Sequence, residues 1–467
     1  MCRPLRTRML ATFVLVLAGG GGLPAALEDP PPTPRRERPP NVLLVIADDF
    51  GVDAFDARAG SPMRARTPCL DRLRAEGVTF TRTWANPVCS PTRATILTGR
   101  YAFRTGVGNA VKLVRPGLPR EELTIPEALD LAPELRYRHA AFGKWHLGNV
   151  QLGGADAPNL AGFSHFSGSL FGANPNRDDG TNGYFRWRHV ENGVTTIRKG
   201  YRPTAMVDDA LAWIRSDGRP WFAQVAFSLP HSPLHAPPAA LHSAELPDDP
   251  PEEAPLPYFR AMVEAMDREL LRLLVGLGRS RPRTVVVFVG DNGTDGVVVE
   301  AAGEASEAQS KGMTFEGGIH VPLVVVGPDL AAGHTCDALV NTTDLFVTIL
   351  DLAGVPRADV EAAARGPLDS ESLVPLLRDP DRAGPRDLAL AEVFADDPGL
   401  HTFRAVRDER YKLMRREGDE DVFREWLFDL ERDPREEHDL LEGTVSDQAR
   451  SIRDRLAARL DALREEK

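Results

Sequence analysis

The stretch Asn41-Val42-Leu43-Leu44-Val45-Ile46-Ala47, followed by Asp48-Asp49, is a continuous apolar run closed by two acids. An apolar run without polar alternation is typical of a parallel strand that is buried on both faces. Similar runs recur at residues 221–228, 284–289 and 321–326. Together these runs predict several buried parallel strands spread along the first two thirds of the chain.

Helical periodicity lies between the apolar runs. It is clearest at residues 258–277, where one face carries Met262, Met266, Leu270 and Leu273. Alternating strands and helices predict an α/β fold: a large α/β/α sandwich with a mostly parallel central sheet.

The sequence texture changes after residue 380. Short segments with strand-like composition and hairpin-like turns lie at residues 388–394, 403–407, 411–415 and 426–430. A charged amphipathic segment at residues 447–465 follows them and predicts a helix. The sequence therefore predicts a small C-terminal α+β domain with a short antiparallel sheet.

We divide the chain into a signal peptide (1–26), a Pro/Arg-rich linker (27–40), a large domain (41–380) and a C-terminal α+β subdomain (381–467). Arg3, Arg6 and Arg8 precede a short apolar core, and Pro24-Ala25-Ala26 offers a cleavage zone. The alternative is an uncleaved N-terminal anchor, but the apolar core is too short to span a bilayer comfortably. We therefore expect a secreted or periplasmic protein without stable membrane insertion.

The 467 residues carry a formal net charge of −12. This charge argues against a nucleic-acid-binding protein, for which a basic domain is expected. It does not exclude a polyanionic substrate, because local charge matters more than the total. Of the four cysteines, Cys2 lies in the predicted signal, while Cys69 and Cys336 could pair in an exported protein.

Two pairs of residues with oxygen-donor side chains follow predicted strands. Asp48-Asp49 ends the first strand, and Asp291-Asn292 follows the strand at residues 284–289. Active sites of such sheets lie at the carboxyl ends of strands. Either pair alone would be typical of a helix N-cap. Together they predict a divalent site, whose carboxylate and amide oxygens suit Ca²⁺ or Mg²⁺ rather than zinc.

Cys89-Ser90-Pro91-Thr92-Arg93, followed by Leu97-Thr98-Gly99-Arg100, is the most distinctive motif of the chain. An isolated cysteine is usually a small buried hydrophobe. In this pattern it resembles the signature of the type I, formylglycine-dependent sulfatases, the arylsulfatase-like members of the alkaline phosphatase superfamily. The resemblance implies that a formylglycine-generating maturation enzyme oxidises Cys89 to an aldehyde. The hydrate of that aldehyde would attack a sulfate ester, form a covalent sulfo-enzyme and expel sulfate by using its second hydroxyl group.

Gly143-Lys144-Trp145-His146-Leu147-Gly148 resembles the second signature of the same family. The resemblance implies that Lys144 holds sulfate and the hydrate, and that His146 is the base. Arg93 would fix the hydrate and neutralise the site. His231, in Pro230-His231-Ser232-Pro233, and Lys311 are candidates for protonating the leaving alcohol.

The metal ligands implied by the resemblance are Asp48, Asp49, Asp291, Asn292 and the modified Cys89, with Ca²⁺ preferred to Mg²⁺. The likeness extends over nearly the whole chain beyond the linker. One departure is His320, where the family usually has arginine, and we expect it to affect specificity more than activity.

The function that follows is hydrolysis of an aryl or glycan sulfate ester. One alternative is a phosphonate monoester or phosphodiester hydrolase of the same superfamily, and another is a non-catalytic protein that only binds sulfated glycan. A basic stretch that includes Trp187 is either a solvated loop face or a subsite for a polyanion. Its charged members are Arg186, Arg188, His189, Arg198, Lys199 and Arg202.

Overall fold

The computed structural model describes residues 38–56, 60–112, 117–172, 180–303, 309–394, 401–417 and 424–465. The predicted signal peptide and most of the predicted linker lie outside these residues. Residues Arg38–Lys467 form one compact unit. Among the described residues, no helix has the length and apolar content needed to cross a membrane.

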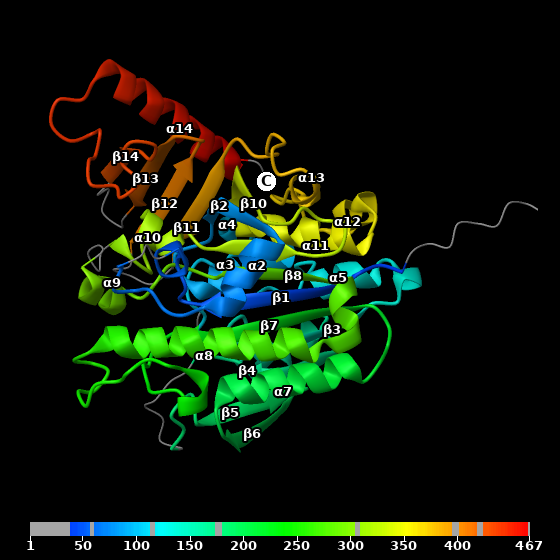
Figure 1. The fold of residues 1–467 in the computed structure, drawn as a ribbon. Helices are drawn as coiled ribbons and strands as arrows, with labels where there is room; N and C mark the ends of the chain where they lie inside the picture. The colour runs from blue at the N-terminus through cyan, green and yellow to red at the C-terminus, as the bar shows by residue number, and fades with distance from the viewer. Residues whose placement is uncertain are drawn as a thin grey trace, which may run out of the picture. The chain divides into compact units, whose positions relative to one another are not determined.

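A ten-stranded mixed sheet organises the structure, in the order β10-β2-β9-β8-β1-β7-β3-β4-β5-β6 (Figure 1). Its centre is β1 (Asn41–Asp48), which runs parallel to β7 (Trp221–Pro230) on one side and to β8 (Thr284–Gly290) on the other. β3 (Arg138–Lys144) adds a fourth parallel strand beside β7. The other strands are β2 (Val78–Trp84), β4 (His165–Ser169), β5 (Arg186–Glu191), β6 (Val194–Lys199), β9 (Leu323–Val326) and β10 (His334–Asn341).

The α/β class and the central parallel strands predicted from the sequence are confirmed. The apolar run at residues 321–326 differs in direction, because β9 pairs antiparallel with both β8 and β2. An apolar run reports burial and carries no information about strand direction. β5 and β6 also pair antiparallel and form a hairpin at one edge of the sheet.

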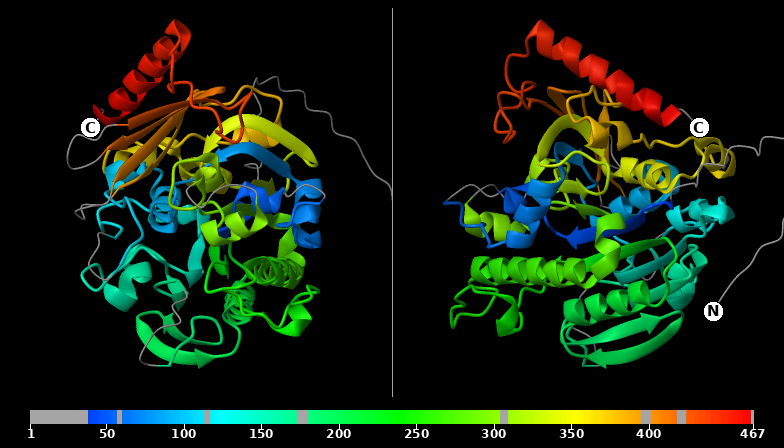
Figure 2. Two further views of the ribbon diagram at one scale, coloured as in Figure 1. Left: turned by 90° about the vertical axis from the view of Figure 1, so that its left-hand side faces the viewer. Right: turned by 45° about the vertical axis from the view of Figure 1, so that its right-hand side comes forward.

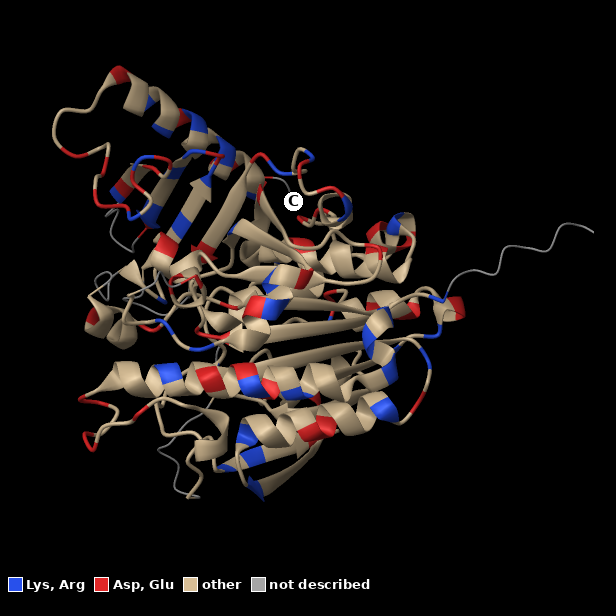
Figure 3. Cartoon of the chain, in the orientation of Figure 1, with Lys and Arg blue, Asp and Glu red and all other residues tan. Residues whose placement is uncertain are grey.

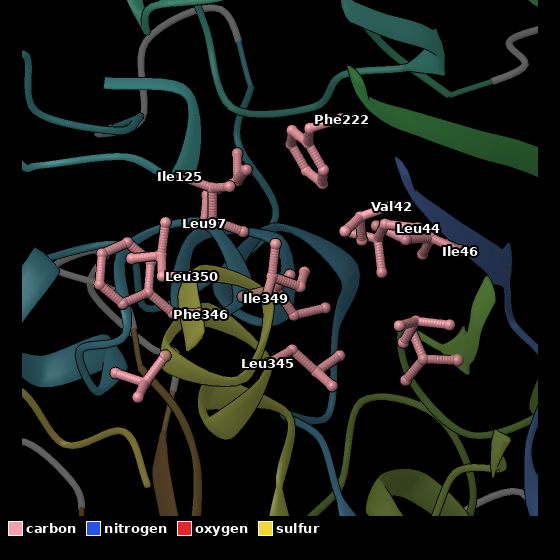
Figure 4. Packing of buried hydrophobic residues seen from close by; sticks show 14 of the residues in the cluster. Val42, Leu44, Ile46, Leu97, Ile125, Phe222, Leu345, Phe346, Ile349 and Leu350 are labelled. Carbon is pink, nitrogen blue, oxygen red and sulfur yellow. The ribbon is translucent and has the colours of Figure 1, made fainter. Parts of the chain in front are cut away.

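Side chains of β1 point alternately to the two faces of the sheet, so both faces are apolar. Helices cover both faces. Leu43, Val45 and Ala47 pack with α7 (Arg202–Arg215) and α8 (Pro255–Gly276) in one core cluster. Val42, Leu44 and Ile46 pack on the other face against Leu97, Ile125, Leu345, Phe346, Ile349 and Leu350 (Figure 4). These two cores make the layers of the predicted sandwich. The predicted helix at residues 258–277 is α8.

The helices on the second face include α3 (Cys89–Thr98), α5 (Ile125–Asp130) and α11 (Leu345–Ala353). The remaining helices before the C-terminal region are short. They are α1 (Val52–Phe55), α2 (Pro68–Glu76), α4 (Ala102–Thr105), α6 (Ala157–Leu160), α9 (Gly296–Ala302), α10 (Glu316–Ile319), α12 (Arg357–Ala363) and α13 (Val374–Arg378).

The C-terminal region forms a four-stranded antiparallel sheet covered by one helix, α14 (Asp447–Glu465) (Figure 2). Leu456 and Leu460 of α14 are buried with Val406 and Leu413 of the sheet. The strands are β11 (Ala389–Val393), β12 (Thr402–Arg407), β13 (Tyr411–Glu417) and β14 (Arg424–Asp429). The predicted strands and helix of this region are therefore confirmed, whereas the domain boundary at residue 380 stays a prediction.

Candidate active site

The carboxyl ends of the four central parallel strands carry the polar residues singled out in the sequence. Asp48 is the last residue of β1, and Lys144 is the last residue of β3. His231 follows β7, and Asp291 and Asn292 follow β8. Because β8, β1, β7 and β3 are neighbours in the sheet, these side chains converge at one edge.

Three carboxylates form the floor of the site. Asp48, Asp49 and Asp291 are completely buried. The Asp49 backbone N–H donates to Asp291 Oδ1 at 3.2 Å, and Asn292 Nδ2 donates to Asp49 Oδ1 at 2.9 Å. Asp49 adopts a φ of 62°, so the chain turns sharply at the end of β1 and directs this second acid into the cluster.

A cationic side chain contacts each carboxylate. Lys144 Nζ donates to both oxygens of Asp48 at 2.8 and 2.7 Å. Lys311 Nζ donates to Asp49 Oδ2 at 2.6 Å. Nε and Nη2 of Arg93 donate to Asp291 Oδ2 at 3.0 and 2.7 Å.

These contacts shift the pKa values in opposite directions. Burial opposes ionisation of Asp48, but Lys144 and His231 outweigh it and hold the pKa of this carboxyl well below its usual range. Burial and the neighbouring Asp48 charge raise the pKa of Asp291 well above its usual range. Burial alone would lower the pKa of Lys311, but the Asp49 carboxylate raises it. The cluster thus contains one carboxyl that is poorly compensated without a further cation.

Cys89 lies at the start of α3, whose ten residues are all buried. Its Sγ is 3.0 Å from Nδ1 of His146. Nε2 of His146 is 3.1 Å from the carbonyl oxygen of Val111, which only accepts hydrogen bonds, so this contact assigns the ring proton to Nε2. Nδ1 therefore directs a lone pair at Cys89. Burial and the Lys144 charge lower the pKa of His146 well below its usual value, which keeps the ring neutral near pH 7.

Ser90 fixes the position of His146. Its hydroxyl donates to the His146 carbonyl at 2.8 Å and accepts from the Val111 backbone N–H at 3.0 Å. Neither Ser90 nor Val111 was predicted to have a role in the site. The place of Ser90 directly after Cys89 was the only sequence signal available, and that place does not reveal which backbone groups the hydroxyl reaches.

His231 and Lys311 form the accessible rim. Their side chains are 18% and 20% exposed, whereas those of Arg93 and Lys144 are 1% exposed or less. His231 Nδ1 donates to the Ser232 carbonyl at 2.6 Å, which leaves Nε2 on the side of Asp49, 3.7 Å from its Oδ2. Burial lowers the pKa of His231 more than the Asp49 charge raises it.

The oxygen donors fit a hard divalent cation. Ligand atoms of Asp48, Cys89 and Asp291 lie within 4.8 Å of one another, and those of Asp48, Asp49 and His231 do likewise. Asn292 Oδ1 is buried and lacks a hydrogen-bond partner among the described residues. A buried acceptor without a donor is costly unless an ion or another donor satisfies it. The structure thus brings together all the predicted metal ligands.

A family model described as "Sulfatase" matches residues 40–355. The chain belongs to the sulfatase family. A second model, "N-sulphoglucosamine sulphohydrolase, C-terminal", matches residues 307–466.

The curated relatives of this chain are distant. It is 28% identical to Arylsulfatase J of Mus musculus over 330 residues, which cover 67% of this chain and 52% of the relative. It is 32% identical to N-acetylgalactosamine-6-sulfatase of Sus scrofa over 349 residues, which cover 68% of this chain and 63% of the relative. The chain thus spans about half to two thirds of these two proteins.

Solved structures share the fold. The structure titled Ps i-CgsB in complex with k-i-k-neocarrahexaose aligns with a TM-score of 0.73 and 23% identity, and the alignment covers 92% of this chain and 93% of that one. The phosphonate monoester hydrolase of Agrobacterium radiobacter aligns with a TM-score of 0.66 and 23% identity, and covers 91% and 95% of the two chains. A phosphonate monoester hydrolase thus shares this fold.

Two further cysteines and two further histidines are not among the residues that contact the carboxylate cluster. Cys69 and Cys336 are free, buried thiols in different core clusters, so they do not pair. His320 contacts Glu316 and donates from Nε2 to the Thr81 carbonyl at 2.7 Å. His235 packs against Tyr184, with ring centroids 4.0 Å apart.

Proposed function

We propose that this chain hydrolyses sulfate monoesters of the aryl or glycan type, after conversion of Cys89 to formylglycine and with Ca²⁺ at the carboxylate cluster. The observation that carries the proposal is the contact of Cys89 with neutral His146 at the edge where three carboxylates and three cationic side chains meet. The maturation enzyme that modifies Cys89 would be a partner. The predicted signal peptide supports an exported enzyme.

The charges of the site support a requirement for the cation. Three carboxylates face Arg93, Lys144 and Lys311, so the ionised side chains roughly cancel. A sulfate ester carries negative charge and gains little from a neutral site. Hydrated formylglycine at position 89 would supply two hydroxyl groups on one carbon. A bound Ca²⁺ would supply the positive charge that holds the sulfate oxygens.

The side chains divide the remaining work. Nδ1 of His146 lies 3.0 Å from Cys89 Sγ, so it can accept a proton from an oxygen that replaces this sulfur. Arg93 is held by Asp291 and by the Lys144 carbonyl, to which Nη1 donates at 2.9 Å. This anchoring fixes the guanidinium beside Cys89 without further ordering during the reaction.

His231 and Lys311 are suited to the leaving-group side because they are the exposed members of the cluster. Lys311 carries a proton at neutral pH, since the Asp49 carboxylate raises its pKa. His231 donates from Nδ1 to the Ser232 carbonyl and burial lowers its pKa, so the neutral ring presents Nε2 as an acceptor, and Lys311 is the proton donor of the pair.

The test compares kcat/KM for a matched aryl sulfate and aryl phosphonate, both measured with the same purified protein. The state of Cys89 in this protein is determined beforehand by mass spectrometry of the Cys89 peptide. The proposal expects a higher kcat/KM for the sulfate, and loss of turnover in Cys89→Ala. A higher kcat/KM for the phosphonate would favour the phosphonate hydrolase alternative. No turnover of any ester by fully converted, Ca²⁺-supplied protein would favour the non-catalytic alternative.

A further inference from the structure

A small cavity adjoins the candidate active site on the side of the β5–β6 hairpin. Its volume is about 110 Å³. Gly172 joins the two regions, because a Cβ placed on it would lie 3.8 Å from Lys144 Nζ and 3.9 Å from His231 Cε1. We call it the Arg202 cavity; its walls include Phe171, Gly172, Trp187, Arg188, Thr195 and Arg202.

Arg202 is a buried cation without an anionic partner in the described part of the chain. It is 3% exposed. Its guanidinium donates to the carbonyl of Gly183 at 3.5 Å and to that of Phe171 at 3.3 Å, and it lies 5.6 Å from the centre of the Trp187 ring. Burial lowers its pKa to about 10, so it remains charged near pH 7. A buried guanidinium with two long contacts to neutral oxygens is poorly compensated.

The helix that begins at Arg202 increases this imbalance. Arg202 is the first residue of the 14-residue helix α7. The N-terminus of a helix carries partial positive charge and favours an anion, so a cation at this position is unfavourable on electrostatic grounds.

A second buried donor in the same cavity lacks an acceptor. Trp187 is 2% exposed, and its Nε1–H has no hydrogen-bond partner among the described residues. A buried indole N–H usually finds an acceptor. Arg202 and Trp187 both line the Arg202 cavity, so the oxygens of one anion bound there would satisfy both donors.

The neighbouring arginine shows the contrast. Arg198, on β6, also lies near the Trp187 ring, but it forms an ion pair with Asp209. Figure 3 shows basic residues on the β5–β6 hairpin, which includes every member of the basic stretch predicted from the sequence except Arg202. The structure thus separates a compensated arginine from one that faces a cavity without a counterion.

We infer that the Arg202 cavity binds a second anionic group of the substrate, a sulfate or carboxylate on the sugar next to the one that carries the reacting sulfate. This inference rests on the proposed function and narrows its substrate class to polyanionic saccharides. A planar guanidinium can donate two parallel hydrogen bonds to such a group, and the Trp187 N–H can add a third.

Binding tests this inference independently of turnover. We would titrate the Cys89→Ala protein with Ca²⁺ and three defined disaccharides by calorimetry. All carry one sulfate at the same position; the second sugar carries a further sulfate, a carboxylate or no charge. The variants are Arg202→Met and Trp187→Phe, and Lys199→Ala is the matched control, since Lys199 is an exposed basic residue on β6 that does not line the cavity.

We expect the parent protein, which is Cys89→Ala without a further substitution, to bind one or both dianionic disaccharides more tightly than the monosulfated one. The group on the preferred disaccharide identifies the second anion. Arg202→Met should raise Kd for the dianionic ligand on the order of tenfold to hundredfold and leave the monosulfated ligand unchanged. Trp187→Phe should have a smaller effect in the same direction, and Lys199→Ala none.

Two results would overturn the inference. One is a parent protein that binds all three disaccharides equally. The other is an unchanged preference in Trp187→Phe together with equal weakening for all ligands in Arg202→Met, which would make both residues structural. A wild-type protein that hydrolyses no sulfate ester but retains an Arg202-dependent preference would refute the proposed function and leave the anion site standing.

Discussion

Replacement of Asp291 by alanine isolates the electrostatics of the site. The substitution removes the carboxylate to which Nε and Nη2 of Arg93 donate, and Arg93 is 1% exposed. At alkaline pH, where Asp291 is ionised despite its raised pKa, removal of this partner from the buried ion pair costs about 3–5 kcal/mol, because the Arg93 charge remains buried. For the roughly 430 residues of the Arg38–Lys467 unit, the entropy of unfolding is about 0.9 kcal/mol/K. Asp291→Ala should therefore lower Tm by about 3–6 °C in EDTA at alkaline pH.

Saturating Ca²⁺ should enlarge this difference. A cation at 100 times its Kd adds about 2.7 kcal/mol to the wild type, or about 3 °C, and the variant should lose this increment. The assay is calorimetric melting of both proteins with and without Ca²⁺. Asp295→Ala is the control, since Asp295 only caps α9 through the Val297 N–H, and it should cost about 1 kcal/mol and keep the Ca²⁺ shift. Equal Tm values for wild type and Asp291→Ala in EDTA at alkaline pH would refute the reasoning.

Three further outcomes follow from the same contacts. His146→Ala should lower kcat by about 10²–10⁴-fold with little change in the far-UV spectrum, and an unchanged kcat would exclude it as the base. Lys311→Ala should slow sugar sulfates more than activated aryl sulfates, as measured by paired kcat/KM values, if Lys311 protonates the leaving oxygen. Burial raises the pKa of Asp267 to about 6, so this group contributes stability below about pH 4 that is lost as pH rises through 6. Between pH 4 and 7, the free energy of unfolding of Asp267→Asn should rise by about 3 kcal/mol relative to that of the wild type, as measured by urea unfolding. Parallel curves of unfolding free energy against pH would contradict this.

Patterns that depend on burial were predictable from the sequence. The apolar runs located β1, β7 and β8, because a strand buried on both faces has no polar alternation. β3 was not predicted as a strand, since its sequence Arg138–Lys144 contains three basic residues and a glycine. Tertiary contacts stabilise the two charged residues at the ends of this strand: Arg138 lies over the Trp213 ring, and Lys144 pairs with Asp48. Such contacts cannot be predicted from the sequence of the strand.

The members of the site were named from the resemblance to the sulfatases, but their pairing could not be predicted. Asp48 and Asp291 could be placed at the same sheet edge because both follow strands that were predicted to be parallel. The sequence does not indicate that Lys144 contacts Asp48 while Lys311 contacts Asp49, because both choices depend on backbone geometry at the strand ends. The imbalance at Arg202 was also hidden, since six basic positions of one stretch look alike until burial and ion pairs distinguish them.

The dependence of turnover on the chemical state of Cys89 tests the central claim most directly. Protein would be prepared with and without a competent formylglycine-generating enzyme, mixed to graded conversion, and quantified by mass spectrometry of the Cys89 peptide. We predict that kcat per total protein rises in proportion to the fraction of aldehyde and extrapolates to zero for the plain thiol. Full turnover by protein that carries only unmodified Cys89 would contradict the account.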